Sequence, residues 1–320
     1  MDNFIFSLNV TIPIFLVILL GYILRKIGLI NENFVSIANK YVFKCALPVM
    51  LFQDIAFTDT LRSAKGSFVL FCALVTIAMF LLVWLCSYVF LKDKSLVGAF
   101  AQAGARGSAA ILGVAFVENI SGSAGMAPLM IVSAVPFFNI LSVIILTFSA
   151  DLNKSAGEKK SHGAVIKKSL FNIVTNPIII GILLGIPFAL LNVKFPAIAT
   201  RTMDYVARTA TPVALIAIGG GFDKQEATRR VKPAIWASLI KLVILPAVFL
   251  PLAVLFHFAS SEMVAILIML ASPTTVSCYI MAVNMENDGP LTSNVILLTT
   301  IFSSLTLTGW IFILRSFNLI

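Results

Sequence analysis

Ten long apolar runs, separated by short polar gaps, take up most of this 320-residue chain. Hydrophobic residues make up 59% of it and charged residues 12%, whereas a soluble domain is about 45–50% apolar and about 25% charged. Because a membrane-spanning helix needs roughly 20 apolar residues, each run is long enough to cross a bilayer. The pattern predicts an all-α membrane protein with ten transmembrane helices and excludes a soluble globular enzyme.

The polar breaks set the boundaries of the predicted spans. These spans cover residues 4–24, 34–57, 67–91, 96–118, 126–149, 171–191, 197–221, 233–257, 262–285 and 292–314.

The gaps on the two predicted sides of the membrane differ in basic residues. One side holds 13 of the 23 Lys and Arg, and the other holds four, namely Arg62, Lys65, Lys194 and Arg315. Since Lys and Arg gather in cytoplasmic loops, the first side is predicted to be cytoplasmic and both termini extracytoplasmic. The net charge of +9 then reflects topology and does not indicate a nucleic-acid partner.

The chain has one long polar stretch, residues 151–169, which contains five lysines. Its composition predicts a cytoplasmic linker between a first five-helix repeat, residues 1–150, and a second, residues 170–320. His162 within it is expected to be a solvated loop residue.

The two halves are related by an internal repeat. At an offset of 164, residues 9–21 align with residues 173–185, and eight of thirteen positions are identical. The same offset aligns residues 41–51 with residues 205–215. Because each half has five spans, an odd number, the second half must enter the bilayer from the opposite side. Such an inverted repeat is typical of secondary transporters, whose substrate sites lie where helices are interrupted.

Spans 4 and 9 correspond under this offset, and both are interrupted. Gly104, Gly107 and Gly113 loosen span 4, while Pro273 removes an amide donor from span 9 and disfavours helix at Ser272. If the breaks cross, two half-helix N-termini would direct free amides and positive dipole ends to one point, which favours an anion. The alternative is that the small residues serve close helix packing.

Five segments of the chain form a specific set of motifs. In order, they are the ARGS stretch (105–108), TNPIIIGILLG (175–185), TPVALIAIGG (211–220), KLVILP (241–246) and SEMVAILIMLASPTTVSCYIMA (261–282). With these motifs the sequence resembles the auxin efflux carrier family of bacterial permeases, which is related to malate and malonate permeases.

The resemblance implies ten helices in a 5+5 inverted repeat with spans 4 and 9 crossing, as in sodium/proton antiporters and bile-acid transporters. Spans 1, 2, 6 and 7 would form a scaffold that pairs in a homodimer. Spans 3–5 and 8–10 would form a transport domain that moves against it like an elevator, in the inner membrane of a bacterial cell.

One departure from the family concerns the substrate. The family typically has Asn where this chain has Ser108, and often Pro near Ala115. A serine has no carboxamide, so the substrate of better known members is not carried over.

Several charged residues fall inside predicted spans, where charges are costly and usually functional, and two of them, Arg106 and Lys241, lie in or beside the interrupted spans. Arg106 precedes Ser108 by two residues, and its guanidinium could bind a carboxylate with two hydrogen bonds. Alternatively, Arg106 extends to the membrane surface or holds carbonyls at a half-helix C-terminus. Lys241, in span 8, is expected to compensate half-helix dipoles, with proton coupling or pairing with an acid as alternatives.

The predicted substrate-binding residues are hydroxyl, amide, small and basic residues at the two breaks and in span 5. They are Arg106, Gly107, Ser108, Ala109, Asn139, Ser272, Pro273, Thr274, Thr275 and Ser277.

These features favour a secondary active transporter for a small organic anion, a mono- or dicarboxylate. A coupling proton or sodium ion could drive it, or it could be a facilitative uniporter. A ligand-binding sensor with a carrier fold is the alternative from another class. The sequence has neither an HExxH motif nor paired membrane aspartates, so it does not indicate an intramembrane enzyme. The four cysteines lack the spacing of a metal site. The expected partners are the lipid bilayer, the anion and a second copy of the chain.

Overall fold

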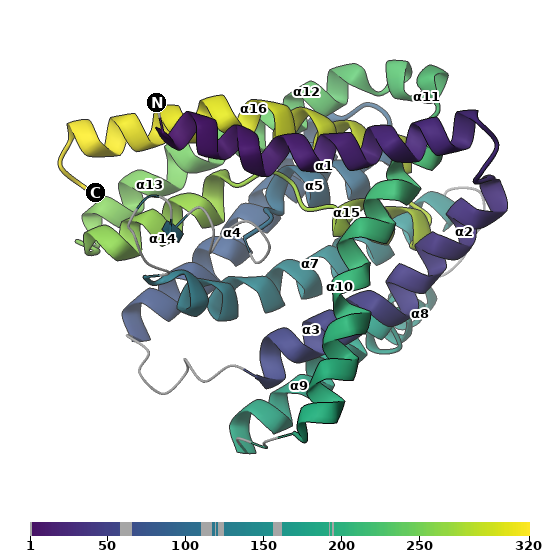
Figure 1. Ribbon diagram of the computed structural model, residues 1–320, viewed down its shortest axis with the longest axis horizontal. Coiled ribbons are helices and arrows are strands. Elements are labelled where there is room, and N and C mark those ends of the chain that lie inside the picture. Colours follow the sequence, from purple (N-terminus) through teal and green to yellow (C-terminus); the bar gives the residue numbers. More distant parts are fainter. Residues whose placement is uncertain are drawn as a thin grey trace.

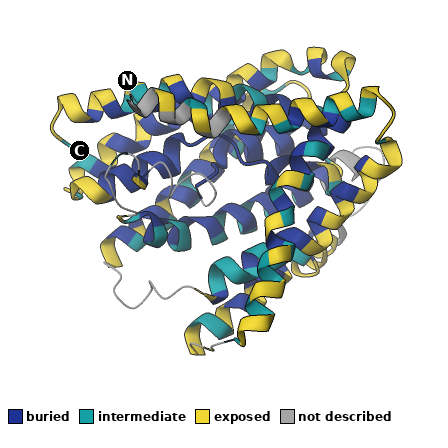
Figure 2. Cartoon of the chain, viewed as in Figure 1, coloured by how far each residue is buried: buried dark blue, intermediate teal, exposed yellow. Residues whose placement is uncertain are grey.

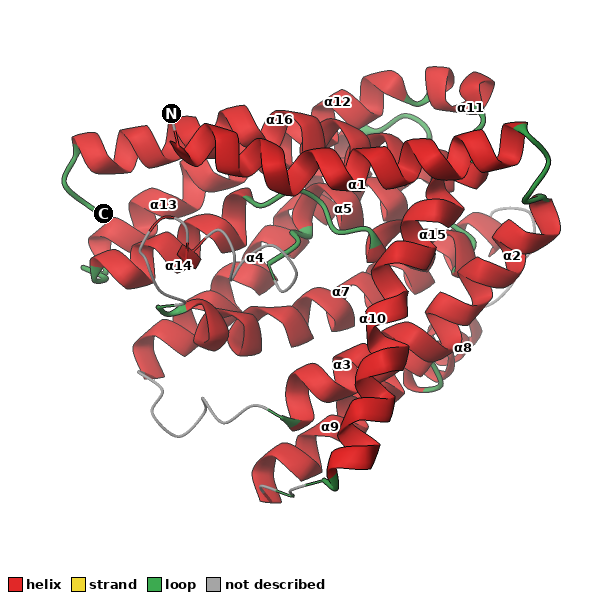
Figure 3. Cartoon of the chain, in the orientation of Figure 1, coloured by secondary structure: helices red, strands yellow, loops and turns green. Residues whose placement is uncertain are grey.

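The computed structural model describes residues 2–57, 66–109, 117, 118, 120, 125–155, 162–191, 193 and 195–320. Within these ranges the regular secondary structure is helical (Figure 3), apart from an isolated bridge between Gly107 and Thr274. Gly113, Ala115 and most of the second part of predicted span 4 lie outside the described residues.

The helices vary widely in length because several are broken. They are α1 (Asp2–Lys26), α2 (Glu32–Tyr41), α3 (Leu47–Ala56), α4 (Gly66–Phe90), α5 (Val97–Ala105), α7 (Ala127–Ser155), α8 (His162–Val174), α9 (Pro177–Leu191), α10 (Ala197–Gly220), α11 (Lys224–Arg229), α12 (Val231–Leu239), α13 (Leu245–Leu255), α14 (Ser260–Ala271), α15 (Ser277–Asn284) and α16 (Gly289–Ser316).

Five helical segments in the described part of the chain are long and apolar enough to cross a membrane. They are Glu32–Ala56, Gly66–Phe90, Ala127–Ala150, Val231–Leu255 and Gly289–Ser316. The pair α8–α9, bent by 56°, makes a sixth if it is one span. The chain is therefore a multi-pass helical membrane protein. The ten-span arrangement stays a prediction, in which the remaining spans fall on α1, α10 and the broken helices.

Two of the long segments contain a short π-helical turn, Val42–Ala46 between α2 and α3 and Ile240–Ile244 between α12 and α13. A proline is the second residue of the helix that follows each turn, Pro48 in α3 and Pro246 in α13. Because proline has no N–H to donate, the preceding residue bonds to the carbonyl five positions back, which produces the wider turn.

The helices form two packed groups (Figure 1). In one, α3 packs on both α9 and α10, and α10 also contacts α1. The other gathers α4, α5, α7 and α12 to α16, with α14 and α15 inside it. α1 runs alongside α16 and so links the two groups.

Two close helix contacts are related by the sequence offset of 164. A Cβ atom on Gly21 of α1 would lie 2.4 Å from the carbonyl oxygen of Ile216 in α10. A Cβ atom on Gly185 of α9 would lie 3.0 Å from the carbonyl oxygen of Phe52 in α3. Gly185 follows Gly21 by 164 positions, and Ile216 follows Phe52 by the same number. Small residues thus let equivalent helix pairs approach closely.

Burial separates an inner and an outer set of helices (Figure 2). Every residue from Met263 to Ala282 is buried, a stretch that covers most of α14, the break after it and most of α15. By contrast α4 exposes large apolar side chains along one face, including Leu70, Leu74 and Leu85. An outer apolar face of this kind suits contact with lipid.

The boundaries of the predicted linker differ from the structure. α7 continues to Ser155 and α8 begins at His162, so much of residues 151–169 is helical. The prediction of a loop histidine at position 162 was wrong, because α8 starts there. Residues 156–161 lie outside the described part of the chain.

Candidate functional site

The two predicted helix breaks meet. α5 ends at Ala105 and α14 ends at Ala271, and the residues after each helix are extended. Gly107 and Thr274 form an antiparallel bridge, and the amide of Ser108 donates to the carbonyl of Pro273 at 2.8 Å. The structure thus brings together Arg106–Ser108 and Ser272–Thr274, which are far apart in the sequence. We call the place where these two segments meet the crossing.

Local chemistry explains the break after α14. Ser272 is extended, with ψ 149°, as expected for a residue that precedes proline. Pro273 cannot donate to the carbonyl of Met269, and the amide of Thr274 donates instead to the hydroxyl of Thr299 in α16, at 3.0 Å. The last turn of α14 therefore loses two of its ordinary amide donors.

Lys241 supplies the missing donors. Its Nζ lies 2.7 Å from the carbonyl oxygen of Leu270 and 3.4 Å from that of Met269, and its side chain is fully buried. A cation at a helix C-terminus also opposes the negative end of the helix dipole. This is the contact that the prediction of dipole compensation requires.

Arg106 extends from the other break towards α7 and α15. Its guanidinium donates to Asn139 Oδ1 at 2.7 Å, to Met281 Sδ at 2.9 Å and to Ser142 Oγ at 3.5 Å, and it is only 4% exposed. Asn139 and Ser142 are themselves held by backbone carbonyls of α7. The guanidinium is therefore fixed in place by neutral groups.

Some buried polar atoms at or beside the crossing form no hydrogen bond with a described residue. Ser272 Oγ, Arg106 Nε and Gln102 Oε1 are buried without a hydrogen-bond partner in the described part of the chain. Buried polar groups are nearly always hydrogen-bonded, so each such group calls for an explanation. A bound polar ligand is one.

The approach of the two breaks requires glycine at position 107. A Cβ atom there would lie 2.5 Å from Ser272 Oγ and 2.9 Å from Lys241 Nζ. Gly107, Ser272 and Lys241 therefore meet at one point, and Arg106 directly precedes Gly107 in the sequence. Two buried cations flank the crossing, and neither forms an ion pair with a described carboxylate.

The other predicted site residues lie in the same region. Ala109 is buried beside the bridge. The hydroxyl of Thr274 donates to the carbonyl of Ala103 in α5, at 2.8 Å, and those of Thr275 and Ser277 are 3.3 Å apart.

Sequence analysis missed four residues that contact the predicted ones, namely Gln102, Ser142, Met281 and Thr299. Thr299 could have been found, because Thr292, Thr299 and Ser303 form a polar stripe on one face of an apolar helix. Polar residues in a span face protein or a cavity. No comparable sequence signal marks Met281.

Two adjoining cavities lie beside α15, the helix that follows the second break. One, of about 260 Å³, is lined by Tyr279 of α15, and it shares Gly221, Phe222 and Asp223 with a second, of about 740 Å³. The second extends to the basic residues Arg25, Lys26 and Lys224. Together they run between α1, α2 and α10 on one side and α11, α15 and α16 on the other.

A polytopic helical protein whose broken helices meet at a buried polar crossing has the architecture of a membrane solute transporter. Comparison with known families agrees. The model of a family described as "Membrane transport protein" matches residues 6–311. The chain therefore belongs to this family, the auxin efflux carrier family, and is a membrane transporter rather than an enzyme.

Relatives in bacteria and archaea match over most of their length. The chain is 25% identical over 313 residues to a Rhizobium meliloti protein named "Putative malonate transporter", with 96% of each chain covered. It is 23% identical to an uncharacterized transporter of Methanocaldococcus jannaschii, covering 96% of this chain and 98% of that one. The uncharacterized transporter YfdV of Escherichia coli is 24% identical, with 87% and 88% covered.

Proposed function

We propose that the protein is a secondary carrier for a small carboxylate, bound at the crossing of the two helix breaks. The observation that supports this most strongly is the presence of two buried cations, Arg106 and Lys241, whose hydrogen bonds in the described part of the chain all go to neutral groups. A charge buried without a counterion is costly, and in a membrane it is functional by default. A bound anion would supply the missing negative charge.

The carboxylate would take up the polar atoms that the protein leaves unused. Arg106 Nε and Ser272 Oγ are donors without partners, and a carboxylate has two acceptor oxygens. Asn139 would orient the guanidinium of Arg106, and Lys241 would keep its contacts with α14. The relative named for malonate makes a dicarboxylate the first substrate to test.

The carrier architecture forms part of the proposal. Ten spans in a 5+5 inverted repeat would place both termini outside and residues 151–169 in the cytoplasm of a bacterial cell. The equivalent contacts Gly21–Ile216 and Gly185–Phe52 support the repeat. The group containing α1, α3, α9 and α10 would be the scaffold and dimer interface, and the other group would move as an elevator.

The two adjoining cavities suggest the access route. They lie between the proposed scaffold and the proposed transport domain. The wider end is lined by three basic residues, Arg25, Lys26 and Lys224, and two acidic ones, Glu32 and Asp223, and Arg25 pairs with Glu32. Tyr279 lines the inner end. The crossing itself is buried, with Ser272 fully buried and Thr274 2% exposed, so release of substrate requires the two helix groups to move apart.

Uptake into liposomes tests the proposal. Purified protein is reconstituted, and uptake of labelled malonate, malate, acetate and lactate is measured with and without proton or sodium gradients. We expect saturable uptake of a carboxylate, and dependence on one gradient would identify the coupling ion. Arg106→Ala should lower uptake at least about tenfold, because it removes charge-assisted hydrogen bonds.

Arg229→Ala is the matched control, since Arg229 is an exposed arginine that pairs only with Glu226 on its own helix. It should transport like the wild type. Normal uptake by a folded Arg106→Ala protein would remove Arg106 from the site. Saturable binding of an anion without flux would identify a ligand sensor instead of a carrier.

A further inference from the structure

An apolar groove of about 530 Å³ lies between α4 and the continuous segment formed by α12, the π-helical turn and α13. Leu82, Cys86 and Phe90 line it from α4, and Trp236 and Val248 line it from the other side. The one hydroxyl in its wall, that of Ser87, donates to the carbonyl of Trp84 at 2.7 Å. The groove therefore presents no unsatisfied hydroxyl and suits a hydrocarbon chain.

The groove is long enough to run through one membrane leaflet. Along α4 its lining runs from Leu82 to Leu91, about 14 Å at about 1.5 Å per residue. Along the facing segment it runs from Pro233 to Phe249, about 24 Å. The hydrocarbon core of a bilayer is about 30 Å thick, so one leaflet is about 15 Å.

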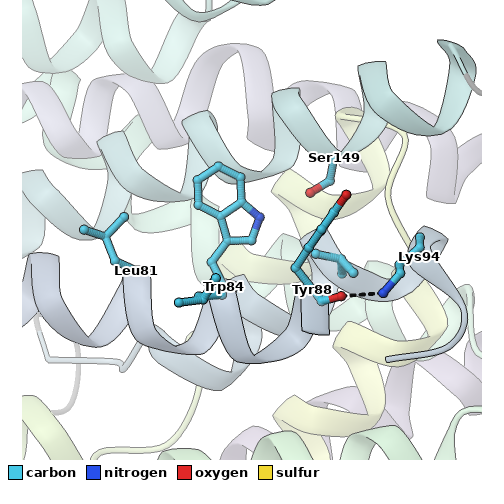
Figure 4. A pocket seen from close by; sticks show the side chains of 7 residues that line it. Leu81, Trp84, Tyr88, Lys94 and Ser149 are labelled. Carbon is cyan, nitrogen blue, oxygen red and sulfur yellow. Dashed lines mark hydrogen bonds between the residues drawn. The ribbon is translucent and has the colours of Figure 1, made fainter. Parts of the chain in front are cut away.

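The residues that line a neighbouring pocket indicate the level of the membrane surface (Figure 4). Trp84 and Tyr88 project from α4 into this pocket of about 440 Å³, which Lys94 and Ser149 also line. Lys94 donates to the carbonyls of Tyr88 and Leu91 and so caps the end of α4. Trp, Tyr and Lys collect where a helix leaves the hydrocarbon. The Leu91 end of the apolar groove therefore lies at headgroup level.

This end of the groove is basic. Lys92 follows Leu91, and Lys232 precedes Pro233, so each is adjacent in sequence to a residue that lines the mouth. Both lysines are exposed, and neither forms an ion pair within the described residues. Arg230 Nη1 lies 3.9 Å from Asp93 Oδ2, which holds the two chain segments near one another.

We propose that the groove binds an acyl chain of an anionic phospholipid whose headgroup phosphate interacts with Lys92 and Lys232. Basic residues beside a groove between transmembrane helices recognise such headgroups. The bound chain would contact Ile240 and Ile244, which flank Lys241 in the π-helical turn. The lipid would therefore stabilise the π-helical turn, from which Lys241 donates hydrogen bonds to the C-terminal carbonyls of α14.

Native mass spectrometry of the purified full-length protein tests the headgroup. Phosphatidylglycerol is the anionic probe and phosphatidylcholine the neutral one, with identical acyl chains. We expect tighter binding of phosphatidylglycerol. Its affinity should fall roughly fivefold for Lys92→Ala or Lys232→Ala and about 30-fold for the double variant, because each basic residue near a membrane surface contributes similarly.

The matched control is Lys224→Ala, an exposed lysine that lines a different cavity. It should bind phosphatidylglycerol like the wild type. Equal affinity for the two lipids, or an unchanged affinity in the double lysine variant, would overturn the proposal.

A second comparison tests the acyl-chain groove. Cys86→Trp fills it, whereas Cys45→Trp adds the same bulk at an exposed cysteine elsewhere. We expect Cys86→Trp to lose the bound phosphatidylglycerol and its stabilising effect on thermal unfolding, and Cys45→Trp to keep both. Retention of the lipid by a folded Cys86→Trp protein would contradict the proposal, even if the lysine variants behaved as expected.

Discussion

At the scale of single residues, the crossing depends on the absence of a side chain at position 107. The nearest neighbours of an added Cβ are the Ser272 hydroxyl, at 2.5 Å, and the Lys241 ammonium, at 2.9 Å. Both are buried groups, and the ammonium is held by carbonyls of α14. A methyl group there would push apart the atoms that we propose as the substrate site.

We therefore expect Gly107→Ala to destabilise the protein by about 1–3 kcal/mol, the usual cost of overpacking, and to weaken carboxylate binding. Thermal unfolding in detergent and ligand binding measure the two effects. Gly104→Ala is the control, because its Cβ would lie an acceptable 3.4 Å from Val83. A second change, Ser272→Ala, should restore part of the stability of Gly107→Ala, and the absence of any restoration would show that this contact is not the cause.

At the scale of elements, the break after α14 is braced by a helix that is distant in sequence. The amide of Thr274 donates to Thr299 of α16, and the hydroxyl of Thr274 donates to the carbonyl of Ala103 in α5. The break is therefore a fixed structure joined to two neighbouring helices.

We expect Thr299→Val to destabilise the protein by about 1–3 kcal/mol, because it leaves the buried amide of Thr274 without an acceptor while keeping the volume. Thr306→Val is the control, since Thr306 bonds only to carbonyls of its own helix. Thermal unfolding of the two variants makes the comparison. Equal melting temperatures would mean that another group accepts from Thr274.

The sequence was sufficient to predict the breaks in spans 4 and 9, but not the contacts that hold them. Pro273 disfavours helix at Ser272 through local sterics, and the repeat indicated the partner break near Ser108. The contacts of Arg106 with Met281 and of Thr274 with Thr299 depend on tertiary packing between helices, which local chemistry does not determine. The break between α8 and α9, which falls inside the predicted span 171–191, was not predicted from the sequence.

At the scale of the whole molecule, the equivalent contacts Gly21–Ile216 and Gly185–Phe52 relate two helix pairs across the chain. If the repeat is structural, the two glycines have the same role. We expect Gly21→Leu and Gly185→Leu to lower the yield of folded protein to a similar extent, because each forces a helix pair apart.

Gly309→Leu is the control, since nothing lies within 4 Å of its added Cβ. Size-exclusion chromatography of membrane extracts measures the folded fraction. A severe defect in one of the two glycine variants with a normal profile in the other would argue against equivalent roles.

The burial of α14 has a consequence for biogenesis. α14 has 12 residues, about 18 Å in length, which is too short to cross a hydrocarbon core of about 30 Å by itself. Lys241 is synthesised before the carbonyls of Met269 and Leu270 that receive its ammonium. During synthesis the ammonium of Lys241 therefore gains these acceptors only after α14 has been made. The energetic cost of the buried lysine is relieved late, when α14 packs against the segment from α12 to α13.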